Sequence, residues 1–277
     1  MGTLKLRRRR TALGAGLATL AMAAGLAAVP AQAVDKTTYV ALGDSYAAGQ
    51  GAGPYLDGCY RSDNTYSELA ADTKAIKLVS NAACSGKTTQ EVVSTQLGRL
   101  NRSTELVTIT AGGNNLGFGA IVTACGAVMV NPTAAAAAAC DKASADATVM
   151  IGSGQLAAEV ASMIRSVKAA APNAEIVVTG YPYLYDPVPV TADPMSVFID
   201  QAKVLADGLN WAIYTAAGTD ATYVDVTTAF AGHGINSLTN DPWINGATGN
   251  ADSFHPNAKG YKAYFAALNA EKVYSAR

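Results

Sequence analysis

Short apolar runs alternate along the chain with longer segments in which apolar residues recur at helical spacing. The short runs are rich in β-branched residues, and they predict strands at 38–42, 76–79, 105–110, 176–179 and 222–226. The longer segments predict helices at 65–72, 88–100, 155–171, 198–217 and 256–270. Strands and helices therefore alternate along most of the chain.

This alternation is typical of a parallel sheet that helices cover on both faces. We predict one three-layer α/β/α domain built on a five-stranded parallel sheet, with no internal repeat and no linker. The pattern leaves the alanine run at 134–139 open, because this run suits either a helical or a loop insertion. In folds of this kind, sites form where the carboxyl ends of the strands meet the loops that follow them.

Residues 1–33 have the layout of a secretory signal peptide. Lys5 and Arg7–Arg10 precede an apolar stretch rich in Ala, Gly and Leu, and Ala31-Gln32-Ala33 is a small-x-small cleavage site. A membrane anchor is the weaker alternative, because Ala and Gly insert poorly into a bilayer. We expect cleavage near Ala33 and a secreted domain at 34–277. The consecutive arginines leave both the general and the twin-arginine export routes open.

The charge balance argues against nucleic acid as a partner. The formal net charge is −1 at pH 7, and the predicted signal peptide holds five of the 20 basic residues and no acidic one. The secreted domain is therefore mildly acidic, without the basic surface that binds phosphate backbones. After the signal peptide, no stretch is long and apolar enough to predict a membrane span.

The chain has four cysteines, Cys59, Cys84, Cys125 and Cys140. An even number in an exported protein predicts two disulfides. Three pairings are open at this point, of which the local one closes the shortest loops. A zinc site is the weaker alternative, because the chain has only two histidines and no Cys-x-x-Cys pair.

Gly43-Asp44-Ser45 directly follows the first predicted strand, so Ser45 stands at a strand's carboxyl end. A capped turn would explain these residues without chemistry. A serine nucleophile needs a general base, and the chain offers His233 and His255. Asp252 lies three residues before His255, near enough to bind one imidazole nitrogen and leave the other to accept the serine proton. His233 has no such acid nearby, and we interpret it as a surface loop residue.

Two glycine-containing segments could supply donors for the oxyanion of acyl transfer. Ala83-Cys84-Ser85-Gly86 follows the second predicted strand, and Ala111-Gly112-Gly113-Asn114-Asn115 follows the third. The Gly86 N–H and the Asn114 amide are the candidate donors. Each segment alone also suits an ordinary turn, and Asp252 also suits an N-cap for the helix at 256–270.

Together these segments resemble the four sequence blocks of the SGNH (GDSL) hydrolase family. Gly43-Asp44-Ser45, Gly86, Gly113-Asn114 and Asp252-x-x-His255 stand in the family's order. With the export signal and the cysteines, the set is similar to the family's secreted actinobacterial lipases and esterases. At Asn115 the chain departs from the family's pattern, where an acid is common. We expect that difference to affect loop bonding and not the reaction.

The resemblance implies a flavodoxin-like fold, carboxylic ester hydrolysis without a metal or cofactor, and the disulfides Cys59–Cys84 and Cys125–Cys140. It also implies an acyl-enzyme on Ser45, with His255 as base, Asp252 as its partner, and an oxyanion held by the N–H groups of Ser45 and Gly86 and the amide of Asn114. An α/β-hydrolase site is a poor alternative, since the sequence around Ser45 is not Gly-x-Ser-x-Gly.

The expected substrate is a small-molecule or lipid ester, cleaved by a lipase or esterase, including a phospholipase A-type enzyme. The aromatic segment at 181–185 and the segment at 187–190 either line an apolar acyl groove or pack beneath a loop. We expect a monomer that contacts lipid surfaces transiently. The alternatives are a carbohydrate esterase that uses the same site, and a non-catalytic binding module on the same fold.

Overall fold

The computed structural model describes residues 35–131, 133–247 and 249–275, so the predicted signal peptide lies outside the described residues. A five-stranded parallel sheet has the order β2-β1-β3-β4-β5. Its strands are β1 (Thr37–Gly43), β2 (Ile76–Asn81), β3 (Leu106–Thr110), β4 (Glu175–Thr179) and β5 (Thr222–Val224). This order is that of flavodoxin-like folds and confirms the predicted fold class. The last strand ends at Val224, two residues earlier than predicted.

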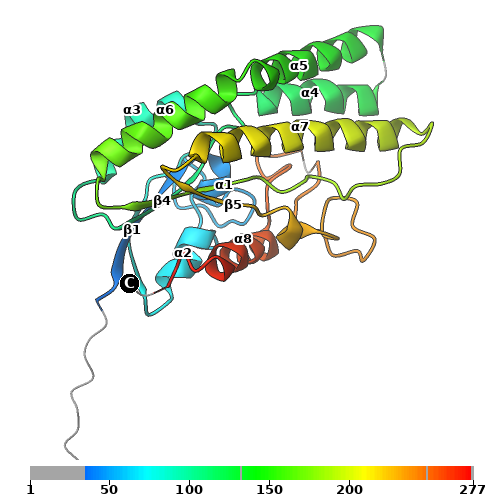
Figure 1. Ribbon diagram of the computed structural model, residues 1–277. Helices are drawn as coiled ribbons and strands as arrows, with labels where there is room; N and C mark the ends of the chain where they lie inside the picture. Colours follow the sequence, from blue (N-terminus) through cyan, green and yellow to red (C-terminus); the bar gives the residue numbers. More distant parts are fainter. Residues whose placement is uncertain (1–34, 132, 248, 276–277) are drawn as a thin grey trace, which may run out of the picture. The chain divides into compact units, whose positions relative to one another are not determined.

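Helices cover the sheet on both faces, with α2 and α8 on one side and α3, α6 and α7 on the other (Figure 1). The α-helices of the described residues are α1 (Ser45–Ala48), α2 (Tyr66–Ala71), α3 (Thr89–Gln96), α4 (Phe118–Val130), α5 (Ala134–Gly152), α6 (Gln155–Ala170), α7 (Pro194–Ala217) and α8 (Ala258–Ala270). Short 3-10 turns follow at Leu97–Arg99 and Thr228–Phe230. The predicted helix at 88–100 therefore ends in a 3-10 turn.

The first residues of two helices follow from their N-terminal capping residues. The helix α7 begins four residues before its predicted start, because the Asp193 side chain accepts the Ser196 N–H and Pro194 suits the first helical turn. Asn257 caps α8 in the same way, accepting the N–H groups of Lys259 and Gly260. The interpretation of Asp252 as the N-cap of this helix is therefore wrong.

The core lies around β1 and β3, the two inner strands of the sheet that carry the site loops. Every residue of β3 and all but one of β1 are buried, which accounts for the apolar runs in the sequence. The two strands are paired in parallel up to Gly43 and Thr110. The loops that follow β1 and β3 therefore start side by side.

The alanine run at 134–139 forms the first turns of α5, in line with the high helix propensity of alanine. The Thr133 side chain caps this helix by accepting the Ala136 N–H. A disulfide joins Cys125 of α4 to Cys140 of α5, so the two helices form a stapled hairpin beside α7 (Figure 1). The sequence pattern did not predict α4.

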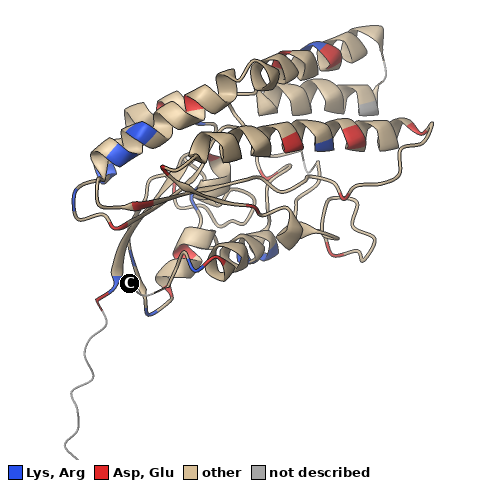
Figure 2. Cartoon of the chain, viewed as in Figure 1, with Lys and Arg blue, Asp and Glu red and all other residues tan. Residues whose placement is uncertain are grey.

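Acidic and basic residues are interspersed along the outer helices and not gathered by sign (Figure 2). On α7, for example, Lys203 and Asp207 form an ion pair of 2.6 Å.

Among the described helices, none is by itself both long and apolar enough to cross a membrane. Only α5 and α6 taken together meet that test, and they are bent by 61° relative to each other.

Candidate active site

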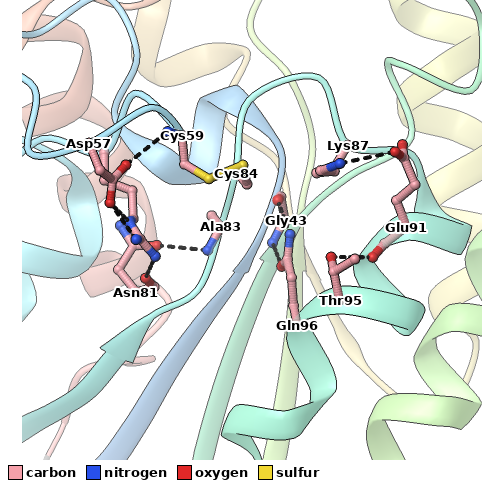
Figure 3. Close-up of a disulfide and its surroundings, with 11 residues drawn as sticks. Gly43, Asp57, Cys59, Asn81, Ala83, Cys84, Lys87, Glu91, Thr95 and Gln96 are labelled. Carbon is pink, nitrogen blue, oxygen red and sulfur yellow. Dashed lines mark hydrogen bonds and ion pairs between the residues drawn. A yellow bond between two sulfur atoms is a disulfide. The ribbon is translucent and has the colours of Figure 1, made fainter.

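Ser45 is held at the carboxyl end of β1 by the two residues before it. A Cβ atom on Gly43 would lie 2.1 Å from the Thr110 carbonyl oxygen, so only glycine lets β1 end this close to β3. The buried Gln96 side chain accepts the Gly43 N–H and donates to its carbonyl, each at 2.8 Å (Figure 3). Asp44 then caps α1 by accepting the Tyr46 N–H, and Ser45 becomes the first residue of that helix.

Ser45 and His255 meet as the sequence predicted. Ser45 Oγ lies 2.8 Å from His255 Nε2, although 210 residues separate them in the chain. His255 Nδ1 lies 2.8 Å from the Ser253 carbonyl oxygen, which can only accept a hydrogen bond. This contact favours the tautomer with hydrogen on Nδ1, so Nε2 is free to accept the serine proton. Burial lowers the pKa of His255 to about 4, which keeps the ring neutral at neutral pH.

The Asp252 carboxylate is not the hydrogen-bond partner of His255. It accepts a hydrogen bond from the Tyr55 hydroxyl, and the Ser253 carbonyl occupies Nδ1 in its place. The main chain of Asp252 contributes differently, since its carbonyl accepts the His255 N–H at 3.2 Å. The spacing argument expected an acceptor on one imidazole nitrogen and assigned that position to the Asp252 carboxylate, where the structure has the Ser253 carbonyl. Ser253 is one residue nearer to His255 than Asp252 is, and no sequence pattern reveals that a main-chain carbonyl takes this position.

The two predicted oxyanion segments lie next to each other. The Asn114 amide donates to the Lys87 carbonyl at 3.1 Å, and Lys87 directly follows Gly86. An amide NH₂ group carries two hydrogens, so this bond orients the group and leaves one hydrogen to donate. Asn114 and Ser45 both line the same cavity.

Gly86 adopts a φ of +78°, a conformation that favours glycine, and a Cβ atom there would meet nothing within 4 Å. Glycine is therefore required at this position by backbone conformation and not by a close neighbour. The N–H groups on either side are engaged, with Ser85 donating to Cys59 and Lys87 to Cys84. The Gly86 N–H has no hydrogen-bond partner among the residues that the structure describes.

Asn115, where the family commonly has an acid, joins the loop after β3 to two helices. Its side-chain oxygen accepts the Thr89 N–H at 3.0 Å, and its amide donates to Glu159 at 2.6 Å. Glu159, from α6, thus supplies a carboxylate to this cluster. Asn115 holds the loop that carries Asn114, as the sequence interpretation expected.

Several tyrosines support the site, and the sequence interpretation missed their roles. The Tyr181 hydroxyl donates to Asp44 at 2.5 Å and accepts the Gly113 N–H at 3.2 Å, which links the loops after β1 and β3. The Tyr46 hydroxyl donates to the Phe254 carbonyl at 2.6 Å, and its ring lies 5.2 Å from that of His255. Burial raises the pKa of the Asp44 carboxyl to about 7, while the bonds from Tyr181 and the Tyr46 N–H oppose that rise.

The disulfides are Cys59–Cys84 and Cys125–Cys140, the local pairing. In the first of these, Cys84 lies two residues from Gly86 and beside the end of β1 (Figure 3).

His233, the second histidine of the chain, stacks on the Trp243 ring at 3.5 Å, and its Nδ1 lies 2.8 Å from the Asp241 carbonyl. Those contacts agree with its interpretation as a loop residue.

An apolar cavity of about 120 Å³ lies beside Ser45. Its lining is mainly aliphatic and aromatic, contributed by α4, α7 and the segment after β4: Phe118, Ile121, Val122, Tyr181, Pro182, Leu184, Phe198, Ala202, Leu205, Ala206 and Leu209. From the segment at 181–185, Tyr181, Pro182 and Leu184 line this apolar cavity, as one of the two interpretations held, whereas Tyr183 and Tyr185 do not. The segment at 187–190 is exposed and does not line this cavity.

Comparison with known proteins agrees with this geometry. The family model described as GDSL-like Lipase/Acylhydrolase matches residues 41–263. A lipase of Streptomyces rimosus is 35% identical over 277 residues, covering 96% of this chain and 99% of that protein. Lipase 1 of Streptomyces coelicolor is 33% identical over 274 residues, covering 94% and 98%.

Two solved structures share the fold at similar identity. The extracellular lipase of Streptomyces rimosus has a TM-score of 0.75 at 34% identity, covering 84% of this chain and 99% of that one. Phospholipase A1 of Streptomyces albidoflavus has a TM-score of 0.75 at 34% identity, covering 85% and 99%.

Proposed function

Because this chain belongs to the GDSL-like lipase/acylhydrolase family, it is a carboxylic ester hydrolase, and we propose that it cleaves lipid esters through an acyl-enzyme on Ser45. One observation carries the proposal: the hydrogen-bonded pair of Ser45 and His255 stands at the edge of an apolar cavity. The pair supplies the nucleophile and its base. The cavity offers space for an acyl chain next to them.

In the proposed reaction, His255 Nε2 takes the Ser45 proton as Oγ attacks the ester carbonyl carbon. The N–H groups of Ser45 and Gly86 and the Asn114 amide stabilise the oxyanion. The protonated His255 then gives its proton to the leaving alcohol. Water attacks the acyl-enzyme with the same base, and the acid is released. The Ser253 carbonyl orients the imidazole throughout, so the minimal apparatus is Ser45 with His255.

The lining of the cavity favours a long apolar acyl group over acetyl. An acetyl group would leave most of this apolar surface without contact, whereas each buried methylene is worth about 0.8 kcal/mol. The names of the relatives, lipase and phospholipase A1, fit the same substrate class. A carbohydrate deacetylase on this site is therefore the less favoured candidate.

We also propose that the enzyme is secreted after cleavage near Ala33 and acts as a monomer at lipid surfaces. Two disulfides in the described domain suit an oxidising compartment, and one relative is named an extracellular lipase. Sequencing the amino terminus of the protein recovered from culture medium tests the cleavage site. A chain beginning well after Val34, or retained in the cytoplasm, would contradict this part of the proposal.

Replacement of the nucleophile tests the function. Ser45→Ala should lower kcat by roughly 10⁴-fold or more on p-nitrophenyl butyrate and on phosphatidylcholine, while the melting temperature stays close to wild type. An organophosphonate should label Ser45 in the wild-type enzyme. Ser94→Ala, on the exposed face of α3, serves as the control and should keep full activity. Full activity in Ser45→Ala, or labelling at another serine, would overturn the proposal.

A further inference from the structure

The segment at residues 51–62, which we call the strap, joins the predicted oxyanion loop to the loop that carries His255. One end of the strap is covalently tied to the oxyanion loop by the disulfide Cys59–Cys84. Beside that disulfide, the Ser85 N–H donates to the Cys59 carbonyl at 3.1 Å. This end of the strap is thus fixed next to Gly86.

The other part of the strap contacts the histidine loop through Tyr55 and through Gly51, where a Cβ atom would lie only 2.8 Å from the Cβ of His255. The Tyr55 hydroxyl donates to the Asp252 carboxylate and accepts the Gly51 N–H at 2.8 Å. The edge-to-face contact with Tyr60, at 5.0 Å between centroids, fixes the Tyr55 ring. Burial and the adjacent Asp252 raise the pKa of Tyr55 to about 12, so the hydroxyl remains a donor at neutral pH. A hydrogen bond to an ionised carboxylate is stronger than one between neutral groups.

The histidine loop needs such support because its backbone is strained. Phe254, directly before His255, has a φ of +63°, which is unfavourable for a bulky residue. Its carbonyl is held by the Tyr46 hydroxyl, and the Ala251 carbonyl accepts a hydrogen bond from the Gln50 side chain. Asp252 lies between these two anchored residues.

We infer that Tyr55 is a positioning residue for ester hydrolysis, whose hydroxyl holds the Asp252 carboxylate and so fixes the loop that aligns His255 with Ser45. The inference rests on the proposed roles of Ser45 and His255. Asp252 then acts on catalysis through Tyr55 and the loop. The alternative is that Asp252 acts on His255 directly, as the third member of a triad.

The two roles of Asp252 predict opposite patterns in a set of variants. If Asp252 accepts from Tyr55, then Tyr55→Phe and Asp252→Ala each lose the same hydrogen bond. Each should lower kcat on p-nitrophenyl butyrate roughly 10- to 100-fold, the effect of a small misplacement of a reacting group, with KM within about twofold. The double variant should be no worse than either single one. Asp252→Asn should keep most of the activity, because its amide oxygen still accepts from Tyr55.

A matched control is available elsewhere in the chain. Tyr183 donates to Asp207 at 2.5 Å, another tyrosine–aspartate pair, and neither residue lines the cavity. Tyr183→Phe should leave kcat and KM unchanged. Circular dichroism melting checks that each variant is folded, and Asp252→Ala provides the same measurement from the other partner if Tyr55→Phe is unstable.

A direct triad role would overturn the inference by a different pattern. Asp252→Asn would then lower kcat on the order of 10⁴-fold, and Tyr55→Phe would behave like wild type. Additive losses in the double variant would also overturn it. Failure of the proposed function is distinguishable, because wild-type Ser45 would then not react with an organophosphonate. Under the inference, Ser45 in Tyr55→Phe is labelled more slowly but to completion.

Discussion

The two disulfides brace two different surroundings of Ser45. Cys59–Cys84 joins the strap to the loop after β2. Hydrogen bonds connect these two loops to the rest of the site, from Tyr55 to Asp252 and from Asn114 to Lys87. Cys125–Cys140 joins two helices, and Cys125 itself lines the apolar cavity. In the proposed reaction, the first region is polar and positions the reacting atoms. The second is apolar and holds the acyl chain of the substrate.

The difference matters because the two kinds of surroundings fail in different ways. A displaced hydrogen-bond donor stabilises the transition state less for every ester, because each substrate forms the same oxyanion. A displaced cavity wall weakens binding in proportion to the apolar surface that the acyl chain buries. A change in the polar region should therefore lower the rate for short and long esters by the same factor. A change in the cavity wall should lower the rate for long esters more than for short ones.

Outside the Ser45–His255 pair, the largest expected effect comes from Asn114 in the polar region. Asn114→Ala removes one oxyanion donor and should lower kcat on the order of 10²–10³-fold, by the same factor for butyrate and decanoate esters. The neighbouring Asn115→Ala is the control. It removes contacts to α3 and α6 only, and should cost no more than about 10-fold. Equal losses in the two variants would mean that Asn114 supports the loop and does not contact the oxyanion.

The sequence predicted the sheet and the meeting of Ser45 with His255 because both leave local signals. Buried parallel strands appear as apolar runs, and Gly43-Asp44-Ser45 and His255 stand in short motifs. The start of α7 was misplaced because its cap, Asp193, precedes the apolar pattern. These signals lie within a few residues of the features that they predict.

The partners of those residues were not predictable by the same means. Gln96 binds Gly43, Tyr181 binds Asp44 and Tyr55 binds Asp252, each across more than 50 residues of chain. A glutamine or tyrosine in these positions carries no local pattern, because its partner is chosen by the tertiary fold. The same limit explains the error about Asp252: the sequence shows that an acid is near His255, but not which atom faces Nδ1.

Removing each disulfide in turn tests the difference between the two regions. The expected loss of kcat is smaller than that of Asn114→Ala. Cys59→Ala with Cys84→Ala should lower kcat for short and long esters alike, roughly 10-fold, because it loosens the strap beside Gly86. Cys125→Ala with Cys140→Ala should leave the butyrate rate within about twofold and lower the preference for decanoate. Each loss should also destabilise the fold by about 3 kcal/mol, measured by urea unfolding. An unchanged chain-length profile in the second variant would contradict the role of the α4–α5 hairpin as a cavity wall.

The smallest expected effect is that of mild acid, and it tests the burial of His255. The reaction needs neutral His255, so kcat/KM falls as pH falls through the pKa of that residue in the free enzyme. An imidazole with an ordinary pKa near 6.5 would already have lost most activity at pH 5. Burial lowers the pKa of His255 to about 4, so the enzyme should lose only about a tenth of its kcat/KM between pH 7 and pH 5.

The titration of Asp44 has to be distinguished from that of His255, because burial raises the pKa of the Asp44 carboxyl to about 7. As pH falls from 8 to 6, Asp44 takes up a proton and the buried negative charge next to Ser45 disappears. That change does not protonate the base, so it should not produce the acid limb. Asp44→Asn removes the titration, and its profile of kcat/KM should still fall near pH 4. The measurement follows ester hydrolysis from pH 3.5 to 8 by chromatography of the released acid. A midpoint near 6.5 in both enzymes would mean that water reaches His255 freely and that the polar region is looser than its hydrogen bonds indicate.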